Sequence, residues 1–358
     1  YRDIIIHGLV RDSKGRKMSK SLGNTLDPLE LSEKHGADAL RFSLIEKANP
    51  GQDVPFDEEW TQAAKKFGNK IWNAAKFIHI YTEGLEDRNL TKVELNENRW
   101  ILNEFNTCLE EFNKLFNEYK ISDAYKLLYN FLWSDLFDWY FEFSKNLVDN
   151  ENYKDETQKV LLNVFLSSIK ILNPAMPHLT EEIWSTFNEE LIIDSSWPSS
   201  FEIKFSDDGE FDDLKSIINQ IRNFKSNYNL KNNLVLDVVK QSNYPEWYNN
   251  QLESIAKINV LQVDAERKSK DKILTFQSGK VVFEISANKY IDIQSEIKRL
   301  SQKIEKLGKS LDVSKNRLEN DKFVKNAKEE LIEEEKANIE KLSSEIETIQ
   351  KTLSSLDN

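Results

Sequence analysis

The chain has 358 residues, which is enough for two to four domains with a large buried core. Charged residues make up 31% of it and hydrophobic residues 39%, which is the balance of a folded soluble protein rather than a disordered one. The formal net charge of -12 argues against a protein that coats nucleic acid with its whole surface, although a local basic patch can still face a phosphate backbone.

Cysteine content and hydropathy limit the compartment. The single cysteine, Cys108, excludes an internal disulfide and a cysteine-rich zinc site, and its place in a helical pattern predicts a small core residue. No apolar run approaches the roughly 18 residues that a membrane span needs. We therefore expect a cytoplasmic protein without a membrane partner.

The first residues predict a strand followed by a basic segment. The β-branched run Ile4-Ile5-Ile6 predicts a strand over residues 1–10 that ends at His7-Gly8. Residues 11–20 then carry five cations against one anion, Asp12, so the sign of the charge is locally reversed. The five cations are Arg11, Lys14, Arg16, Lys17 and Lys20.

Residues 15–24 have the sequence Gly-Arg-Lys-Met-Ser-Lys-Ser-Leu-Gly-Asn. Lysines in a loop bounded by glycines can follow phosphate oxygens, and they stabilise a transition state that spreads charge over those oxygens. A P-loop is excluded, because it needs Gly-Lys-Ser/Thr with another glycine five residues earlier. The loop is therefore a candidate phosphate site of another kind.

The run from Lys17 to Asn24 resembles the second signature of the class I aminoacyl-tRNA synthetases, in the branch that handles valine, isoleucine and leucine. The resemblance implies ATP as a substrate with Mg²⁺ as its companion, and no metal bound by the protein itself. It also implies that Lys17 and Lys20 are catalytic, with Lys20 the main contributor. The ATP-binding residues implied in this way are His7, Lys17, Met18, Ser19, Lys20 and Ser21. A strand-end histidine with satisfied hydrogen bonds is the alternative for His7.

Two short helices are expected after the loop. Asp27-Pro28 supplies an N-cap and a first helical proline, and Gly36 ends that helix. By the resemblance, a second helix then leads from the C-terminal end of a catalytic core, residues 1–48, to the next domain. The run Asn49-Pro50-Gly51-Gln52-Asp53 breaks the helical pattern, so residues 49–59 are expected to form a linker.

Residues 60–200 keep a helical period, and the aromatic-rich stretches at 100–119 and 123–147 are expected to form a bundle core. The first helix, residues 60–81, carries four lysines and no acid, which makes it a candidate for phosphate contact. A merely solvated lysine face is the alternative. The candidate tRNA-binding residues on this helix are Lys65, Lys66, Lys70 and Lys76.

Further runs resemble the anticodon-binding bundle of the same synthetase branch, namely Asp138-Trp139-Tyr140 and the run from Pro177 to Trp184. The runs from Asn49 to Asp53 and from Lys70 to Ala74 resemble the valine-specific members most, although the family more often has Thr in place of Asn49. Isoleucyl or leucyl specificity is the alternative. The isoleucyl members commonly end in a cysteine-rich zinc region, which a single cysteine does not allow.

The last part of the chain predicts two further domains. Residues 201–290 combine a helix with three β-rich runs and are expected to form a small α/β subdomain. Residues 291–358 repeat apolar residues at 4-3 spacing in two arms, with a turn at 320–327, which predicts an antiparallel coiled-coil hairpin.

The two arms differ in charge. Residues 292–328 carry ten cations and six anions, or +4, whereas residues 329–358 carry three cations and nine anions, or -6. The first arm is therefore expected to face RNA, and a dimerisation zipper is the alternative. The candidate tRNA-binding residues on it are Lys298, Arg299, Lys303, Lys306 and Lys309.

The expected fold is mainly α: the end of a nucleotide-binding α/β core, an α-helical anticodon-binding bundle, a small α/β subdomain and a C-terminal antiparallel coiled-coil hairpin. The resemblance implies the C-terminal part of a longer enzyme, because the family's first signature, His-Ile-Gly-His or a variant, does not occur here. The implied reaction is activation of valine with ATP and its transfer to tRNA(Val), with this part alone inactive and monomeric. A stand-alone tRNA-binding or coiled-coil module is the rival interpretation.

Overall fold

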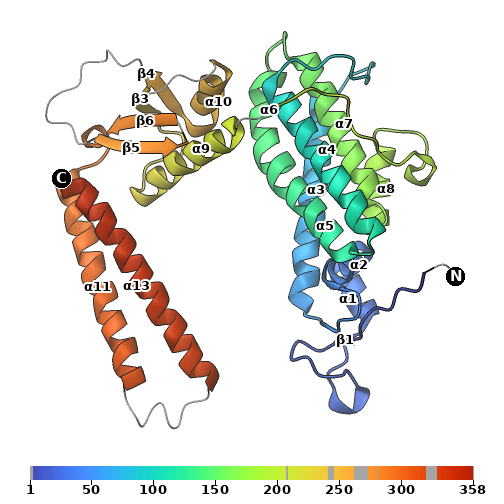
Figure 1. Ribbon diagram of the computed structural model, residues 1–358, viewed down its shortest axis with the longest axis horizontal. Coiled ribbons are helices and arrows are strands. Elements are labelled where there is room, and N and C mark those ends of the chain that lie inside the picture. Colours follow the sequence, from blue (N-terminus) through green and yellow to red (C-terminus); the bar gives the residue numbers. More distant parts are fainter. Residues whose placement is uncertain are drawn as a thin grey trace. The chain divides into compact units, whose positions relative to one another are not determined.

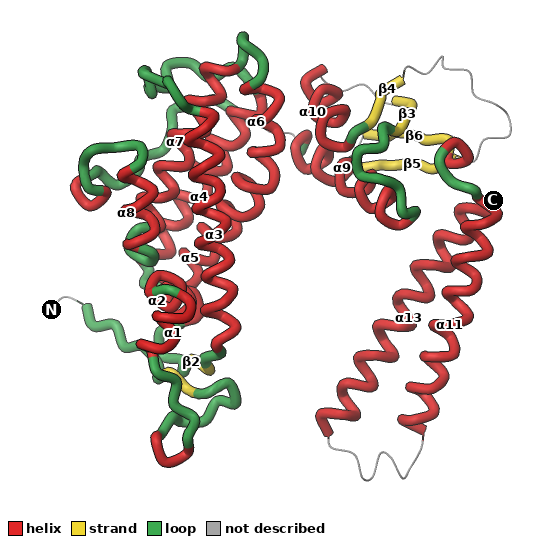
Figure 2. The backbone as a smooth tube through the Cα atoms, turned by 180° about the vertical axis from the view of Figure 1, so that it is seen from behind, coloured by secondary structure: helices red, strands yellow, loops and turns green. Residues whose placement is uncertain are grey.

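A computed structural model of the chain describes residues 3–206, 209–240, 246–261, 273–279, 281–319 and 329–357 (Figure 1). The chain forms two compact units, Tyr1–Phe211 and Asp212–Asn358. The first unit is mostly helical, and the second combines a four-stranded sheet with two long helices (Figure 2). None of the helices in the described ranges is long and apolar enough to cross a membrane.

The first unit begins with a short parallel pairing of β1 (Val10–Arg11) with β2 (Val54–Pro55). The strand predicted for residues 1–10 is therefore confirmed only at its end. Ile4, Ile5 and Ile6 lie outside any strand and are 81%, 50% and 74% exposed. A strand needs a neighbour to receive its backbone hydrogen bonds, and among the described residues such a neighbour is present only from Ile6 onward.

Helices α1 (Pro28–His35) and α2 (Ala37–Lys47) follow the loop, as predicted. The Asp27 carboxylate accepts a hydrogen bond of 2.8 Å from the Leu29 N–H and so caps α1. Gly36 ends α1 with a φ of 96°, a conformation that strains residues with a Cβ atom. Sequence and local geometry agree here because every signal lies within a few residues.

The rest of the first unit is a helical bundle. Its helices are α3 (Glu58–Tyr81), α4 (Asn96–Asn117), α5 (Ile121–Asn130), η2 (Phe131–Tyr140), α6 (Phe141–Val148), α7 (Lys154–Leu172) and α8 (Pro177–Ser185), with a short turn η3 (Ile192–Asp194) after them. Aromatic side chains fill the interior, as their helical spacing predicts. Fully buried examples are Phe67, Trp100, Phe105, Phe112, Tyr125, Tyr140, Phe143 and Phe165.

One stretch of the bundle differs from the expected α-helix. The run predicted over residues 123–147 is divided, because its middle third, η2, is a π-helix. A π-helix still keeps apolar residues on one side, so the period of the sequence does not reveal it. Cys108 on α4 is 4% exposed, which confirms it as a core residue, and burial raises the pKa of its thiol to about 12.

The second unit contains a small α/β fold, as predicted. Its sheet has the order β4-β3-β6-β5, with β3 and β4 parallel and the other neighbours antiparallel. The strands are β3 (Leu236–Lys240), β4 (Ile258–Leu261), β5 (Ile273–Ser278) and β6 (Val281–Ser286), and the helices are α9 (Glu210–Asn227), α10 (Glu246–Ala256) and the short η4 (Ala287–Lys289). Helix α10 and strand β5 were not predicted from the sequence. Phe224 of α9 packs edge-on against Phe276 of β5, with ring centroids 5.7 Å apart.

Lys225 near the end of α9 is 2% exposed and holds three segments of this fold together. Its Nζ donates to the backbone carbonyls of Asn232 (3.2 Å), Leu234 (2.7 Å), Ala256 (2.8 Å) and Lys257 (3.2 Å). Burial lowers the pKa of its ammonium group to about 8. Carbonyl oxygens surround the charge and satisfy its donors, which makes this a structural lysine.

The two long helices, α11 (Ile293–Glu319) and α13 (Glu329–Asp357), lie side by side as an antiparallel pair (Figures 1 and 2). Leu300 and Ile349 are 6% and 7% exposed and pack together in the seam, near the start of α11 and the end of α13. This arrangement confirms the coiled-coil hairpin, and the turn predicted at 320–327 lies outside the described residues. At a rise of about 1.5 Å per residue, α11 is on the order of 40 Å long.

A polar layer interrupts the seam. Ser314, which is 4% exposed, donates to Glu335 (3.3 Å) and accepts a hydrogen bond of 3.0 Å from Asn338. Arg317 pairs with the same Glu335 at 2.8 Å, and this contact is the main reason that the pKa of Glu335 is lowered. The two helices are thus joined by polar bonds at the position where the apolar repeat has a serine.

Candidate functional site

The loop of residues 15–24 is organised by one carboxylate, Asp12, which is 8% exposed. Its Oδ1 accepts hydrogen bonds from the backbone N–H groups of Lys14 (3.1 Å) and Arg16 (2.7 Å). Its Oδ2 accepts from Arg16 Nε (2.8 Å) and Asn24 Nδ2 (3.0 Å). Because these donors favour the charged form, the pKa of Asp12 falls to about 2, with the Asn24 bond as the largest cause.

Asn24 closes the loop from its other end. Besides the bond to Asp12, its Nδ2 donates to the Lys17 carbonyl (3.2 Å), and its Oδ1 accepts from the Ser19 N–H (2.9 Å). Between Ser19 and Asn24, the chain forms the short 3-10 helix η1 (Lys20–Leu22). The backbone that carries both candidate catalytic lysines is therefore fixed by side-chain bonds, while the lysine side chains themselves stay outside.

The five cations of residues 11–20 fall into two groups. Both arginines pair with aspartates, and all three lysines are exposed. The pairs are Arg11 with Asp53 and Arg16 with Asp12. In the described part of the chain, Lys17 and Lys20 have no ion-pair partner. The arginines thus support the loop, and the lysines are available to a ligand.

The remaining candidate ATP-binding residues are less closely connected. The hydroxyls of Ser19 and Ser21 lie 3.2 Å apart, and Met18 beside them is half-buried. His7 is exposed, and its Nδ1 donates to the Gly8 carbonyl (2.8 Å). Among the described residues, His7 has no hydrogen bond to the loop. Its geometry favours the strand-end alternative, and its contact with ATP stays a prediction.

The run expected as a linker is fastened to the segment before the loop. A Cβ atom on Gly8 would lie 1.8 Å from the Gln52 carbonyl oxygen, so only glycine allows the two backbones to approach this closely. Val54 N–H donates to the Leu9 carbonyl (2.8 Å), and Asp53 accepts from the Leu9 N–H (2.8 Å). That Leu9 bond is the largest cause of the lowered pKa of Asp53. Residues 52–55 thus brace the strand that leads into the loop.

Helix α2 connects this region to the bundle. Asp38 on α2 accepts a hydrogen bond of 2.6 Å from the Leu179 N–H in the first turn of α8. Arg41, one turn later, donates to the Pro174 carbonyl (2.9 Å). A carboxylate at a helix N-terminus satisfies a donor that the helix itself leaves free.

Three of the four candidate lysines on α3 are exposed: Lys65, Lys66 and Lys76. Lys65 Nζ donates to the Lys34 carbonyl (3.0 Å), and Lys76 Nζ lies 5.7 Å from the centroid of the Trp72 ring. Neither contact neutralises the charge, because a carbonyl and a ring carry no net charge. These lysines keep the positive field that the sequence predicts.

Lys70 is placed differently. Its Nζ donates to Asp138 (2.6 Å) and to the Trp133 carbonyl (3.3 Å), and it lies 3.7 Å from the centroid of the Trp133 ring. The ion pair and the cation–π contact tie α3 to the π-helix η2. A phosphate would have to compete with Asp138 for this ammonium group, so the role of Lys70 in tRNA binding stays a prediction.

The candidate residues on the arm belong to the second unit, and all five are exposed on α11: Lys298, Arg299, Lys303, Lys306 and Lys309. Arg299 pairs with Glu296 (2.5 Å) and donates to the Asn227 carbonyl (3.1 Å). Lys309 pairs with Glu305 at 2.7 Å. Arg299 therefore anchors the base of the arm, whereas the lysines lie along its exposed side.

Four residues that organise this region, Asp12, Asn24, Asp53 and Asp38, were given no role on the basis of the sequence. Asp12 is the only acid among five cations, and this isolation is the one signal that could have found it. Asn24 acts within the loop segment, whereas Asp53 and Asp38 act through contacts with residues far away in the sequence. The described ranges contain no group of three or more His, Cys, Asp or Glu residues placed to hold a metal ion.

Three sequence families match the chain. Residues 1–57 match the class I tRNA synthetases (I, L, M and V), residues 98–240 match the anticodon-binding domain of tRNA ligase, and residues 292–357 match the valyl tRNA synthetase tRNA binding arm. The chain belongs to the class I aminoacyl-tRNA synthetases, which confirms the resemblance found in the lysine loop and the bundle.

Within that class, valine–tRNA ligases of several bacteria are similar to this chain. The protein of Petrotoga mobilis is 36% identical over 94% of this chain and 41% of its own length. The proteins of Pseudothermotoga lettingae and Enterococcus faecalis are each 34% identical, over 99% and 94% of this chain and 41% and 40% of their own lengths. The chain thus spans about two fifths of the length of the curated relatives it matches. A solved LeuRS–tRNA–LeuAMS complex from Agrobacterium radiobacter K84 matches 54% of this chain and 23% of its own at 21% identity and a TM-score of 0.45, which is too distant to carry an argument.

Proposed function

We propose that the chain supplies the ATP-phosphate loop and the tRNA-binding surfaces of a valine–tRNA ligase, which activates valine with ATP and transfers it to tRNA(Val). The observation that carries the proposal is the division of charge in the loop. Lys17 and Lys20 are exposed and without an ion pair in the described ranges, while Arg11 and Arg16 are both paired. Ammonium groups on flexible stems can follow phosphate oxygens as the reaction proceeds. The names of the relatives support valine as the amino acid.

In the activation step, the valine carboxylate attacks the α-phosphorus of ATP and pyrophosphate leaves. Negative charge grows on the phosphate oxygens in the pentavalent transition state, and Lys17 and Lys20 stabilise that charge more than they stabilise the ground state. Mg²⁺ arrives with ATP as part of the substrate. Asp12 and Asn24 hold the backbone beneath the lysines, so the loop is already ordered when ATP binds.

For tRNA, we assign the anticodon region to the bundle of residues 60–200 and a further contact to the arm of residues 291–358. We assign residues 1–48 to the end of the catalytic core, residues 49–59 to a connecting segment that pairs with β1, and residues 201–290 to a small α/β subdomain. The arm contributes exposed lysines whose contacts with phosphates release counterions. Because its two helices bury their apolar seam against each other, we assign a monomer. The cytoplasm remains the location that we assign from the sequence.

The test is binding of this chain to tRNA(Val) and to the same tRNA with an isoleucine anticodon. We expect tighter binding of the valine version, because the bundle would then contact the changed bases directly. Equal, salt-sensitive binding of both would contradict the specificity for valine and leave only backbone recognition. Failure to bind either RNA would contradict the assignment of tRNA-binding surfaces altogether.

A further inference from the structure

The base of the hairpin is held against the end of α9 (Figure 1). Tyr228, the residue that follows α9, packs against the cluster formed by Leu300 of α11 and Ile349 of α13. A half-buried ring of the α/β fold thus meets a cluster to which both helices of the hairpin contribute. Phe224, one turn earlier on α9, lies behind this ring, with the two ring centroids 5.0 Å apart.

An ion pair lies beside this ring. Glu296 in the first turn of α11 is 9% exposed, and Arg299 donates to both of its oxygens, from Nε at 2.7 Å and from Nη2 at 2.5 Å. The same Nη2 donates to the carbonyl of Asn227, the last residue of α9, at 3.1 Å. A helix leaves its last carbonyls without partners, and its dipole favours a cation there. Burial raises the pKa of Tyr228, and Glu296 is the next cause, so the two side chains lie close together.

The segments on both sides of this contact are themselves fixed. Helix α9 is closed by Asn229, which has a φ of 53°, and by a bond of 2.8 Å from the Leu230 N–H to the Lys225 carbonyl. The segment before α11 is bonded to the sheet, because the Tyr290 hydroxyl accepts from the Asp237 N–H of β3 at 2.7 Å. The hairpin is therefore attached at its start and again within its first two turns. Two attachments restrict its direction, whereas one would leave a pivot.

We infer that Tyr228, Glu296 and Arg299 form a joint that holds the hairpin in one direction relative to the α/β fold. In tRNA binding they are positioning residues, because they set where the exposed lysines of α11 lie without having to touch the RNA. This role in tRNA binding rests on the proposed function. A hairpin without the joint would take up the direction that suits the tRNA only part of the time, and the apparent affinity falls by that fraction.

The direction of the hairpin is measured on the full chain without RNA. Spin labels on Asn223→Cys and Ser310→Cys, both at exposed positions, report the distance between α9 and α11 by double electron–electron resonance. The natural Cys108 is buried and does not compete for the label. We expect one narrow distance in the otherwise unmodified chain and in Tyr228→Phe, which keeps the ring. Tyr228→Ala and Glu296→Ala should each widen the distribution about twofold.

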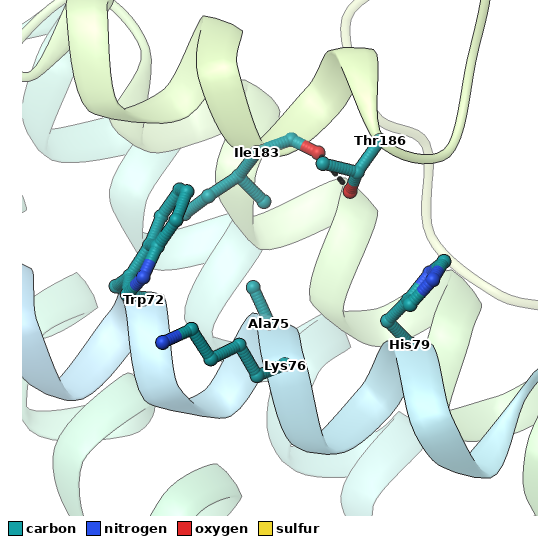
Figure 3. Close-up of a pocket in the computed structure, with 6 residues that line it drawn as sticks. All are labelled: Trp72, Ala75, Lys76, His79, Ile183 and Thr186. Carbon is teal, nitrogen blue, oxygen red and sulfur yellow. Dashed lines mark hydrogen bonds between the residues drawn. The ribbon is translucent and has the colours of Figure 1, made fainter.

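The control for losing a half-buried ring elsewhere is Trp72→Ala, which removes a ring from the pocket between α3 and α8 in the first unit (Figure 3). Its label distance should stay narrow. Thermal unfolding by circular dichroism establishes that each variant is folded, and Glu296→Ala decides if Tyr228→Ala does not fold. A broad distribution in the unmodified chain, or a narrow one in the folded joint variants, would overturn the inference.

The positioning role is tested by binding of tRNA(Val) to the same variants. Glu296→Ala removes an anion from the basic helix, so charge alone predicts tighter binding, whereas loss of the joint predicts binding about tenfold weaker. The matched control, Lys298→Gln on the same helix, should weaken binding and flatten its salt dependence while the label distance stays narrow.

Unchanged or tighter binding by Glu296→Ala would show that the direction of the hairpin does not matter to the tRNA, and the proposed function would stand. If the unmodified chain does not bind tRNA(Val), the proposed function and the positioning role both fail. The label distances still decide in that case whether the joint holds the hairpin.

Discussion

The Asp38 carboxylate accepts a hydrogen bond of 2.6 Å from the backbone N–H of Leu179, a residue 141 positions further along the chain. Since α1 and α2 follow the lysine loop directly, this bond joins the loop region to the helical bundle. Arg41 adds a second connection through the Pro174 carbonyl. In the proposed enzyme, the bundle and the loop are therefore connected by short helices and direct bonds rather than by a flexible tether.

Asp38→Ala should lower the free energy of unfolding by about 1–3 kcal/mol, because the first turn of α8 loses its acceptor. Urea unfolding followed by circular dichroism measures the change. The control is Glu33→Ala, an exposed acid on α1. If both variants lose the same stability, the bond to Leu179 has no special role.

In a complete ligase containing this chain, Lys20→Ala should lower valine-dependent pyrophosphate exchange about a hundredfold, since one charge that stabilises the transition state is removed. The tRNA dissociation constant should stay unchanged. Lys14→Ala, which removes an exposed cation from the same segment, should remain close to the unmodified enzyme. An unchanged exchange rate for Lys20→Ala would show that Lys20 is not catalytic.

The pKa of Asp12 gives a prediction about pH. Its folded-state pKa, about 2, lies below the ordinary 3.8, so its bonds stabilise the loop fully above about pH 4 and are lost as the pH falls towards 2. The carboxyl carbon shift of Asp12 in an NMR titration should not begin to move until below about pH 3. In Asn24→Ala, the midpoint should rise, because the largest cause of the shift is gone. Identical titrations would exclude Asn24 as that cause.

Lys225→Met should destabilise the second unit by about 3 kcal/mol, because buried carbonyl groups lose their donor while the volume of the side chain changes little. Hydrogen exchange of the backbone amides of α9 and β3 in increasing denaturant measures this change for the second unit alone. Lys231→Met, at an exposed position between α9 and β3, is the matched control and should have little effect. A stable Lys225→Met chain would mean that water replaces the ammonium group.

On the arm, Lys298→Gln and Lys306→Gln should weaken tRNA binding and flatten its salt dependence, by up to about one unit in the log–log slope for each phosphate that is no longer neutralised. Lys336→Gln, at an exposed position on the acidic second helix, should change neither. Arg299→Gln should mainly lower stability, since Arg299 is paired with Glu296. Sedimentation tests the alternative. If the lysine variants bind tRNA normally but no longer form a dimer that the unmodified chain forms, the hairpin is a dimerisation zipper.

Local signals predicted the helices well. The N-cap at Asp27, the end at Gly36 and the seam around Leu300 follow from residues close together in the sequence, and the structure agrees with each. These features depend on propensity and period, which a single sequence contains. The lysine loop was recognised differently, from its cation-rich composition and its resemblance to a family signature, and the roles of its residues stay predictions.

The sequence could not reveal which side chains pair with one another across the fold. Lys70 was assigned to phosphate because residues 60–81 contain no acid, yet it pairs with Asp138, 68 positions away. Arg11 likewise pairs with Asp53, 42 positions away, so two of the predicted basic groups have structural tasks. The π-helix η2 and the short extent of β1 also depend on neighbours that no local pattern specifies.

The polar layer in the hairpin has a mechanical consequence. A slip of one helix by a heptad would move it about 10 Å along its neighbour and would leave Ser314, Glu335 and Asn338 without one another. The apolar residues of the seam could pack together again after such a slip, but these polar groups could not. The polar layer therefore fixes the register of the two helices. Because only one register satisfies these groups, the hairpin has one defined length, which sets how far it can reach from its base.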